Sequence, residues 1–197
     1  MEITAKMVKE LRDKTKVGLM DCKKALNEAK GDIDEAIKIL RKKGIAKAAE
    51  KSTRKAKEGI IYSYIHPGSK IGVLLELSCE TDFVARNEKF KKLTKKIAMH
   101  IAATNPLSIS QEDINQKVIE EEKEIYTAQA INSGKPEKII DRIVEGRLKK
   151  FYKENCLLNQ ALVMDENITI QQLLTESIVE FGENISISRF ARFQIGK

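Results

Sequence analysis

The chain has 197 residues, of which 42% are hydrophobic and 33% charged. This length suits one good-sized domain or a small and a medium one, and the apolar content is ample for a buried core, which excludes a wholly disordered protein. No segment approaches the roughly 20 consecutive apolar residues of a membrane span, and the first residues offer no apolar secretion signal. We therefore expect a cytoplasmic protein without membrane contact.

The net charge of +7 is concentrated near the N-terminus, where residues 1–58 carry 17 Lys and Arg against 10 Asp and Glu. The densest basic stretch is 41–57, in which Glu50 is the sole acidic residue. Such a stretch can contact nucleic acid, but no aromatic side chain accompanies it to stack on a base. We favour a solvated helix or linker face over direct RNA binding.

Three cysteines, Cys22, Cys79 and Cys156, are far apart and form no CxxC pair. This spacing argues against a disulfide framework and against a structural zinc site. We expect small buried side chains in a reducing compartment.

Residues 1–44 are predicted to form three short helices and a partner-docking domain. Gly31 ends the second helix, Asp32 begins the third with a capping-box-like sequence, and Gly44 ends it. Each helix carries an apolar stripe at helical spacing. The stripes are Ile3, Met7, Val8 and Leu11, then Leu19, Cys22, Leu26 and Ala29, then Ile33, Ala36, Ile37 and Leu40.

A basic tether, helical or flexible, is predicted over 45–58 because no strong apolar stripe continues there. Residues 59–65 then predict a strand, 66–69 a turn and 70–79 an antiparallel partner strand. This hairpin opens the core domain, predicted over 59–197.

The hairpin leads into a strand-to-helix elbow at residues 79–87. Thr81 or Asp82 can cap the helix that follows, predicted over Thr81–Ala103. Phe83 has two interpretations. Spacing alone favours it as the first core residue of that helix, whereas a helix entry can also hold an aromatic side chain outward as an anchor for a partner.

Two long helices are predicted within 111–154, joined around Ser133-Gly134-Lys135, and they form an antiparallel pair. A further helix begins near Thr169 and stops at Gly182, and alternation over 185–195 predicts a third strand. The expected fold is α+β: a three-stranded antiparallel sheet covered by helices, with the long helix pair appended.

Enzymatic motifs are absent from the sequence. His66 and His100 are the only residues suited to act as neutral-pH bases, and neither lies in a nucleophile motif. No GxxxxGK[ST] phosphate loop occurs. The acids Glu76, Glu80 and Asp82 share a strand face and its exit, but such acids usually face solvent. We expect no enzyme activity, no metal site and no cofactor.

Two motifs resemble the signatures of the elongation factor Ts family. The first is Thr81-Asp82-Phe83-Val84-Ala85-Arg86-Asn87, and the second is Gly18-Leu19-Met20-Asp21-Cys22-Lys23-Lys24-Ala25-Leu26, in the expected order. Residues 98–102, 133–136 and 145–150 extend the resemblance over nearly the whole chain. One departure is Ala161-Leu162, which stands where the family commonly has Pro-Phe and puts the local turn geometry in doubt.

The resemblance implies a guanine-nucleotide exchange factor for the translational GTPase elongation factor Tu, bound in its GDP and nucleotide-free forms. It implies a ubiquitin-associated-like N-terminal domain. Phe83, set by Thr81, Asp82 and Val84, would dislodge the partner's magnesium ion.

Further contacts are implied elsewhere in the chain. Leu19 and Met20 are secondary contacts or ordinary packing residues, and His100 is a partner contact or a helix-surface residue. Because the chain resembles the short form of the family, with one half of the duplicated core, we expect a homodimer.

Overall fold

A computed structural model describes residues 3–15, 17–134 and 136–196. The chain divides into two compact units. The first unit lies within Met1–Ile61, Glu76–Lys91 and Gln172–Ser188, and the second within Tyr62–Leu75, Lys92–Gln171 and Arg189–Lys197. The three-stranded sheet contributes residues to both. The domain boundaries 1–44, 45–58 and 59–197 stay predictions.

Three helices open the first unit and enclose a small core of their own. They are α1 (Ala5–Thr15), α2 (Leu19–Glu28) and α3 (Ile33–Ser52). Asp32 caps α3, because its Oδ1 accepts a hydrogen bond from the Glu35 amide at 2.9 Å. The predicted stripes supply the core: Val8, Leu11, Cys22, Ala25, Leu26, Ala36 and Leu40 are buried.

The predicted helix end at Gly44 is wrong, because α3 continues without interruption to Ser52. A glycine inside a helix costs only about 1 kcal/mol relative to alanine, which is too little to end a helix by itself. Ala48 is buried, and a Cβ at position 44 would lie in ordinary contact with Val179, 3.4 Å away. The first half of the predicted tether is therefore helical.

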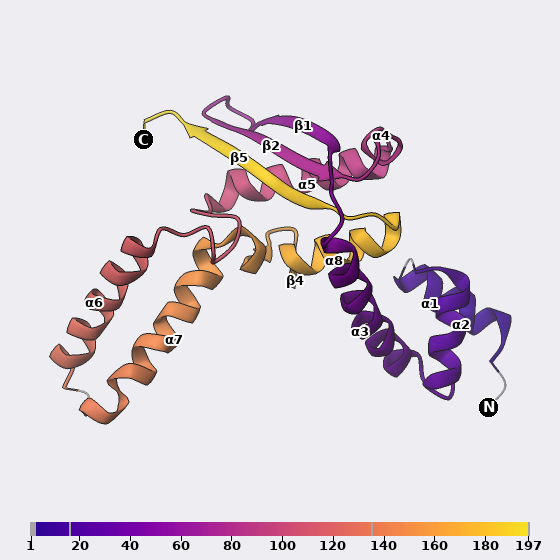
Figure 1. The fold of residues 1–197 in the computed structure, drawn as a ribbon, viewed down its shortest axis with the longest axis horizontal. Coiled ribbons are helices and arrows are strands. Elements are labelled where there is room, and N and C mark those ends of the chain that lie inside the picture. The colour runs from indigo at the N-terminus through magenta and orange to yellow at the C-terminus, as the bar shows by residue number, and fades with distance from the viewer. Residues whose placement is uncertain (1–2, 16, 135, 197) are drawn as a thin grey trace. The chain divides into compact units, whose positions relative to one another are not determined.

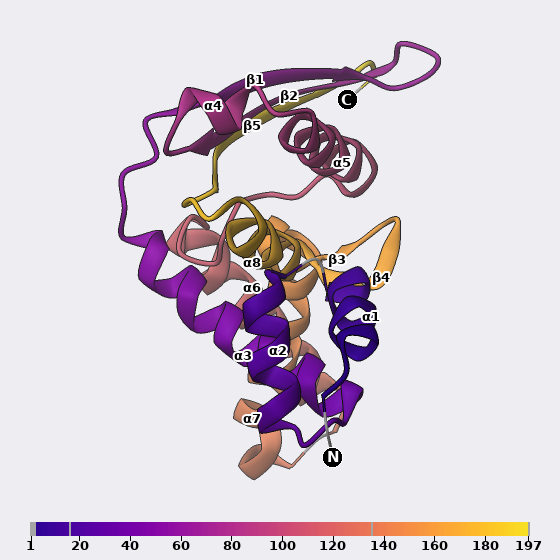
Figure 2. The same ribbon diagram turned by 90° about the vertical axis from the view of Figure 1, so that its right-hand side faces the viewer.

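The main sheet has the strand order β1-β2-β5 and is antiparallel, which confirms the predicted fold class. β1 and β2 form the hairpin that leads to the elbow, and Figure 2 shows the three strands edge-on. The strands are β1 (Glu58–Ile65), β2 (Ile71–Cys79) and β5 (Ser186–Gln194).

The predicted helix over Thr81–Ala103 is two helices: α4 (Asp82–Ala85) and α5 (Glu88–Thr104). They separate at Asn87, whose Oδ1 accepts a hydrogen bond from the Lys89 amide at 2.9 Å. Within the first unit, Phe90 in the first turn of α5 packs edge-on against Phe181 of α8 (Ile170–Phe181), with ring centroids 5.9 Å apart.

In the second unit, α5 contacts β5 through Arg192, whose Nε and Nη2 donate hydrogen bonds to the Ala102 carbonyl oxygen at 3.1 and 3.0 Å. The chain then forms the predicted antiparallel pair, α6 (Gln116–Asn132) and α7 (Glu137–Asn155), which lie side by side in Figure 1. Of the predicted loop, Lys135 lies outside the described residues. A separate apolar cluster holds the pair together: Ile119, Val144, Leu148 and Phe151.

The predicted start of the pair at residue 111 is wrong. Asp113 instead closes a turn, because its Oδ2 accepts hydrogen bonds from the amide and hydroxyl of Ser110 at 2.8 and 2.7 Å. Asn115 caps α6 by accepting from the Lys117 amide at 3.0 Å. The helix therefore begins five residues later than the sequence predicts.

A second, two-stranded sheet was not predicted. After a short 3-10 helix (Leu157–Asn159), β3 (Ala161–Leu162) pairs with β4 (Asp165–Thr169) in antiparallel register. The pair Ala161-Leu162, whose turn geometry the sequence left in doubt, thus lies in a strand with Leu162 buried.

Candidate functional site

The elbow between β2 and α4 is closed by Thr81. Its backbone is extended, and its Oγ1 accepts a hydrogen bond from the Val84 amide at 3.4 Å. The Ala85 amide donates to the Thr81 carbonyl oxygen, and the Arg86 amide donates to the Asp82 carbonyl oxygen, at 3.2 and 3.0 Å. Thr81, rather than Asp82, is the cap that the sequence left open.

This single turn points its four side chains in two directions. Val84 and Ala85 are buried, whereas Asp82 and Phe83 are exposed, and 79% of the Phe83 surface remains accessible. The core interpretation of Phe83 is therefore wrong, and the alternative of an outward-held ring is the one the structure supports. An isolated exposed phenylalanine at a fixed turn is suited to insertion into a partner.

Beside the ring, Asp82 forms an exposed ion pair with Arg86, with Oδ2 and Nη2 3.0 Å apart. Ion pairs at this exposure contribute roughly 0–1 kcal/mol to stability. Both charges can therefore change partners at little cost when another molecule docks.

Leu19 and Met20 begin α2, directly after Gly18. Their side chains are 50% and 62% exposed, so they are not packing residues of the three-helix core. Two adjacent exposed apolar side chains at a helix start give the first unit a further apolar patch in addition to Phe83.

His100 belongs to a different environment, inside the second unit, where it is fully buried. Its Nε2 lies 2.9 Å from Gln160 Oε1, and its Nδ1 accepts a hydrogen bond from the Val163 amide at 3.2 Å. With Nδ1 accepting, Nε2 carries the proton and the ring is neutral. Burial lowers the pKa of His100, although the bond to Gln160 opposes the shift.

The interpretation of His100 as a helix-surface residue is therefore wrong. A direct partner contact through this side chain would require the interior of the second unit to open. No sequence signal pointed to Gln160, which lies 60 positions away along the chain.

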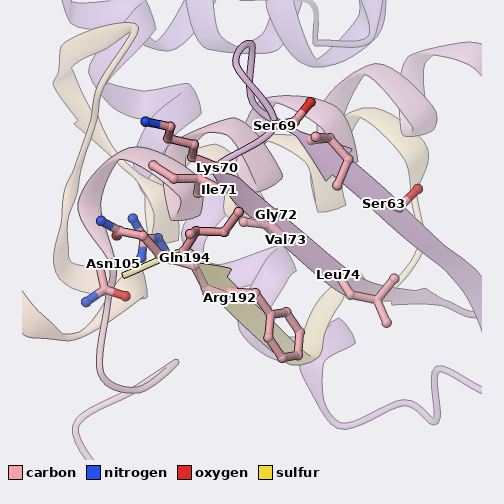
Figure 3. Close-up of a pocket in the computed structure, with 13 residues that line it drawn as sticks. Ser63, Ser69, Lys70, Ile71, Gly72, Val73, Leu74, Asn105, Arg192 and Gln194 are labelled. Atoms are coloured by element: carbon pink, nitrogen blue, oxygen red, sulfur yellow. The ribbon is translucent and has the colours of Figure 1, made fainter. Parts of the chain in front are cut away.

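A groove of about 650 Å³ lies against the strands in the second unit (Figure 3). Ile65 of β1 and Leu74 of β2 contribute apolar surface. Phe193 and Ile195, 70% and 73% exposed, contribute more from the C-terminal end of the chain. The predicted alternation over 185–195 does not place these residues on one buried face, because Ile185 and Ile187 are buried while Phe193 and Ile195 are not.

Comparison with known proteins shows to which family the chain belongs. The sequence model of the family described as "Elongation factor TS" matches residues 2–197. The chain belongs to the elongation factor Ts family. It is 57% identical over 197 residues to an elongation factor Ts of Fervidobacterium nodosum, covering 100% of both chains. It is 59% identical over 195 residues to one of Caldanaerobacter subterraneus, covering 99% of this chain and 98% of that one. It is also 56% identical over 197 residues to one of Alkaliphilus oremlandii, covering 100% and 91%.

Membership in the elongation factor Ts family confirms the resemblance seen at residues 18–26 and 81–87 and makes the chain a translation elongation factor. In this family member, part of the basic stretch 41–57 forms ion pairs within the chain. Lys43 pairs with Glu28, and Lys47 pairs with Asp21 at 2.8 Å, which lowers the pKa of Asp21. These contacts leave fewer free cations for a phosphate backbone.

The thiols of this elongation factor Ts chain offer no reactive group. Cys22, Cys79 and Cys156 are buried and free, as predicted. Burial raises the pKa of Cys79 to about 11, so it stays a thiol at neutral pH. Within the described ranges no cluster of potential metal ligands forms, and no described helix has the length and apolar content to cross a membrane.

Proposed function

We propose that the chain is a guanine-nucleotide exchange factor for elongation factor Tu, acting by protein–protein contact and not as an enzyme. The observation that carries this proposal is the exposure of Phe83 on a hydrogen-bonded turn, in a chain of the elongation factor Ts family. A rigid aromatic anchor docks without first losing much conformational freedom. The site of action is the cytoplasm, where the three free thiols stay reduced.

The physical basis of exchange is linkage. A protein that binds the nucleotide-free GTPase more tightly than its GDP complex must weaken GDP affinity by the same factor. The exchange factor binds the GDP complex, destabilises bound magnesium and GDP, and leaves when GTP refills the site. The magnesium ion belongs to the partner, and the exchange factor supplies no cofactor.

Within this mechanism the residues of the elbow divide the work. Phe83 inserts between partner side chains close to the phosphates and the magnesium ion, and Asp82 supplies a polar contact beside it. Thr81 and Val84 support the turn and do not face the partner. Thr81 caps the turn, and the buried side chain of Val84 anchors it in the core. Leu19 and Met20 provide a second contact. His100 has an internal structural role.

We further propose that the chain works as a homodimer holding two partner molecules. A chain with one half of the duplicated family core leaves partner surface to be covered, and a second copy can supply that cover. The exposed apolar residues of the groove support self-association, because exposed patches of this kind commonly mark interfaces.

The proposal is tested by mixing the chain with elongation factor Tu loaded with fluorescent GDP and following release in excess unlabelled GTP. We expect release well above the spontaneous rate, saturating with the concentration of the chain. Release at the spontaneous rate contradicts the proposal. An RNA-binding function is separated by its salt dependence, because phosphate contacts weaken steeply between about 50 and 200 mM salt, whereas a contact centred on Phe83 does not.

A further inference from the structure

One carboxylate holds the backbone of the elbow in place. Glu183 follows α8, and its Oε2 accepts hydrogen bonds from the amides of Glu80 and Thr81, both at 3.1 Å. Its Oε1 accepts a third from the Thr81 hydroxyl at 2.6 Å. Hydrogen bonds to a charged acceptor are about twice as strong as neutral ones, so this cluster is a strong local constraint.

The constraint is reciprocal. Glu80 Oε1 accepts a hydrogen bond from the Asn184 amide at 2.6 Å, so each glutamate satisfies the backbone next to the other. The Asn184 side chain in turn donates to the carbonyl oxygens of Arg54 and Ser52, at 2.7 and 3.4 Å. The pair Glu183-Asn184 therefore ties the elbow to the end of α3.

The cluster reaches Phe83 through Thr81. The Thr81 hydroxyl donates to Glu183 and accepts from the Val84 amide, and donation to a charged group strengthens an oxygen as an acceptor. α4 has four residues, far below the length at which a helix is stable by itself. Its orientation, and that of the Phe83 ring, must therefore come from its cap and its buried residues.

We infer that Glu183 is a positioning residue for Phe83, fixing the ring in the direction that nucleotide exchange requires. This inference rests on the proposed exchange function. Without the Glu183 carboxylate, water replaces the acceptor for three donors, and the turn samples orientations in which the ring is misdirected. After docking, insertion of the ring must then also order the turn, which slows that step.

The two measurable parameters of exchange respond differently to such a loss. Docking at Leu19 and Met20 involves none of the atoms held by Glu183, so the concentration of chain that gives half-maximal GDP release changes little. The maximal rate depends on the ring reaching its place. We expect Glu183→Ala to lower that rate at least about tenfold, a typical consequence of losing a charge-assisted hydrogen bond.

Two further variants test whether the fall in maximal rate depends on the hydrogen bonds of Glu183. The amide side chain introduced by Glu183→Gln can still accept two hydrogen bonds through its Oε1 but turns a donor toward the third, so the maximal rate of this variant falls between wild type and Glu183→Ala. The matched control is Glu180→Ala, one helical turn earlier, whose carboxylate pairs with Lys89 Nζ at 2.6 Å, outside the elbow residues 79–87. That control stays within about twofold of wild type.

Combination with Phe83→Ala separates positioning from a general loss of structure. If Glu183 acts through the ring, adding Glu183→Ala to Phe83→Ala lowers the maximal rate by less than about twofold further, because the ring is already gone. A tenfold loss in both backgrounds overturns the inference. So does a Glu183→Ala variant with wild-type maximal rate.

Amide hydrogen exchange measures how firmly Glu183 holds the elbow backbone, independently of exchange activity. In Glu183→Ala the amides of Glu80 and Thr81 should exchange at least about tenfold faster than in wild type, while amides of α2 keep their rates. Unchanged protection overturns the inference even if GDP release is slowed. If wild type itself does not accelerate GDP release, the exchange function falls, and amide exchange still decides whether Glu183 orders the elbow. If Glu183→Ala does not fold, Glu183→Gln carries both measurements.

Discussion

Phe83 and Val84 are neighbours in sequence and opposites in environment: 79% of the surface of Phe83 is exposed, against 6% for Val84. Their effects on stability should differ accordingly. Phe83→Ala removes a ring that already lies in solvent, so the free energy of unfolding should change by less than about 0.5 kcal/mol. Val84→Ala should lower it by about 1–2.5 kcal/mol through lost burial and a small cavity. Chemical denaturation of both variants measures the difference, and a Phe83→Ala loss as large as that of Val84→Ala would contradict the exposed position of the ring.

Gly59 occupies a place that no other residue fits. Its φ is +149°, and a Cβ there would lie 2.3 Å from the Leu77 carbonyl oxygen. Gly59→Ala should therefore destabilise the hairpin by at least about 2 kcal/mol. Gly146 is the matched control, because it lies inside α7 with open space around it, and Gly146→Ala should stabilise the chain by about 0.5–1 kcal/mol. A denaturation midpoint of Gly59→Ala at or above that of wild type would rule out this account of Gly59.

His100 makes stability sensitive to acid. Its pKa is lowered in the folded chain, chiefly by burial, so between the ordinary value near 6.5 and the lowered value the unfolded chain binds a proton that the folded chain does not. This contribution to stability is complete above about pH 6.5 and is lost as the pH falls toward the lowered pKa. His100→Gln keeps a donor and an acceptor but does not titrate, so the variant should lose less stability than wild type between about pH 7 and 5. Urea titrations at both ends of this pH range measure the loss of unfolding free energy. Equal losses in wild type and in His100→Gln would show that His100 is not responsible.

We expect self-association at the surface formed by the exposed apolar residues of the groove. Replacing Phe193 and Ile195 together by serine should move the chain from dimer to monomer in sedimentation equilibrium, because the change removes the most exposed apolar side chains of that surface. Ile125 and Ile139 of the helix pair, also exposed, provide the comparison. A dimer lost only when Ile125→Ser and Ile139→Ser are combined would assign self-association to the helix pair instead.

Local signals in the sequence predicted much of this fold. The capping sequence at Asp32, the turn of the β1–β2 hairpin and the apolar stripes of the first three helices all depend on residues close along the chain. The side-chain cap at Asn87 is equally local but was missed, because the apolar spacing continues across it. The continuation of α3 past Gly44 was missed because one glycine does not by itself end a helix, and the burial of Ala48 one turn later follows from the folded chain.

The candidate site was predicted only in part for the same reason. The motif at residues 81–87 marked the elbow, and spacing alone placed Phe83 in the core, because spacing does not register that α4 ends after one turn. Glu183 lies 102 positions from Thr81, in a turn with no motif, and nothing in the sequence connects them. The burial of His100 likewise depends on contacts with Gln160 and Val163 that only the folded chain reveals.

The most direct test of the central claim is the maximal rate of labelled GDP release from elongation factor Tu, measured with wild type and with Phe83→Ala at saturating concentrations. The account predicts strong acceleration by wild type and a loss of at least about tenfold in the variant, the size of effect expected of a dominant anchor residue, with its unfolding free energy unchanged. Equal maximal rates for the two proteins would contradict the claim that the outward ring of Phe83 drives exchange.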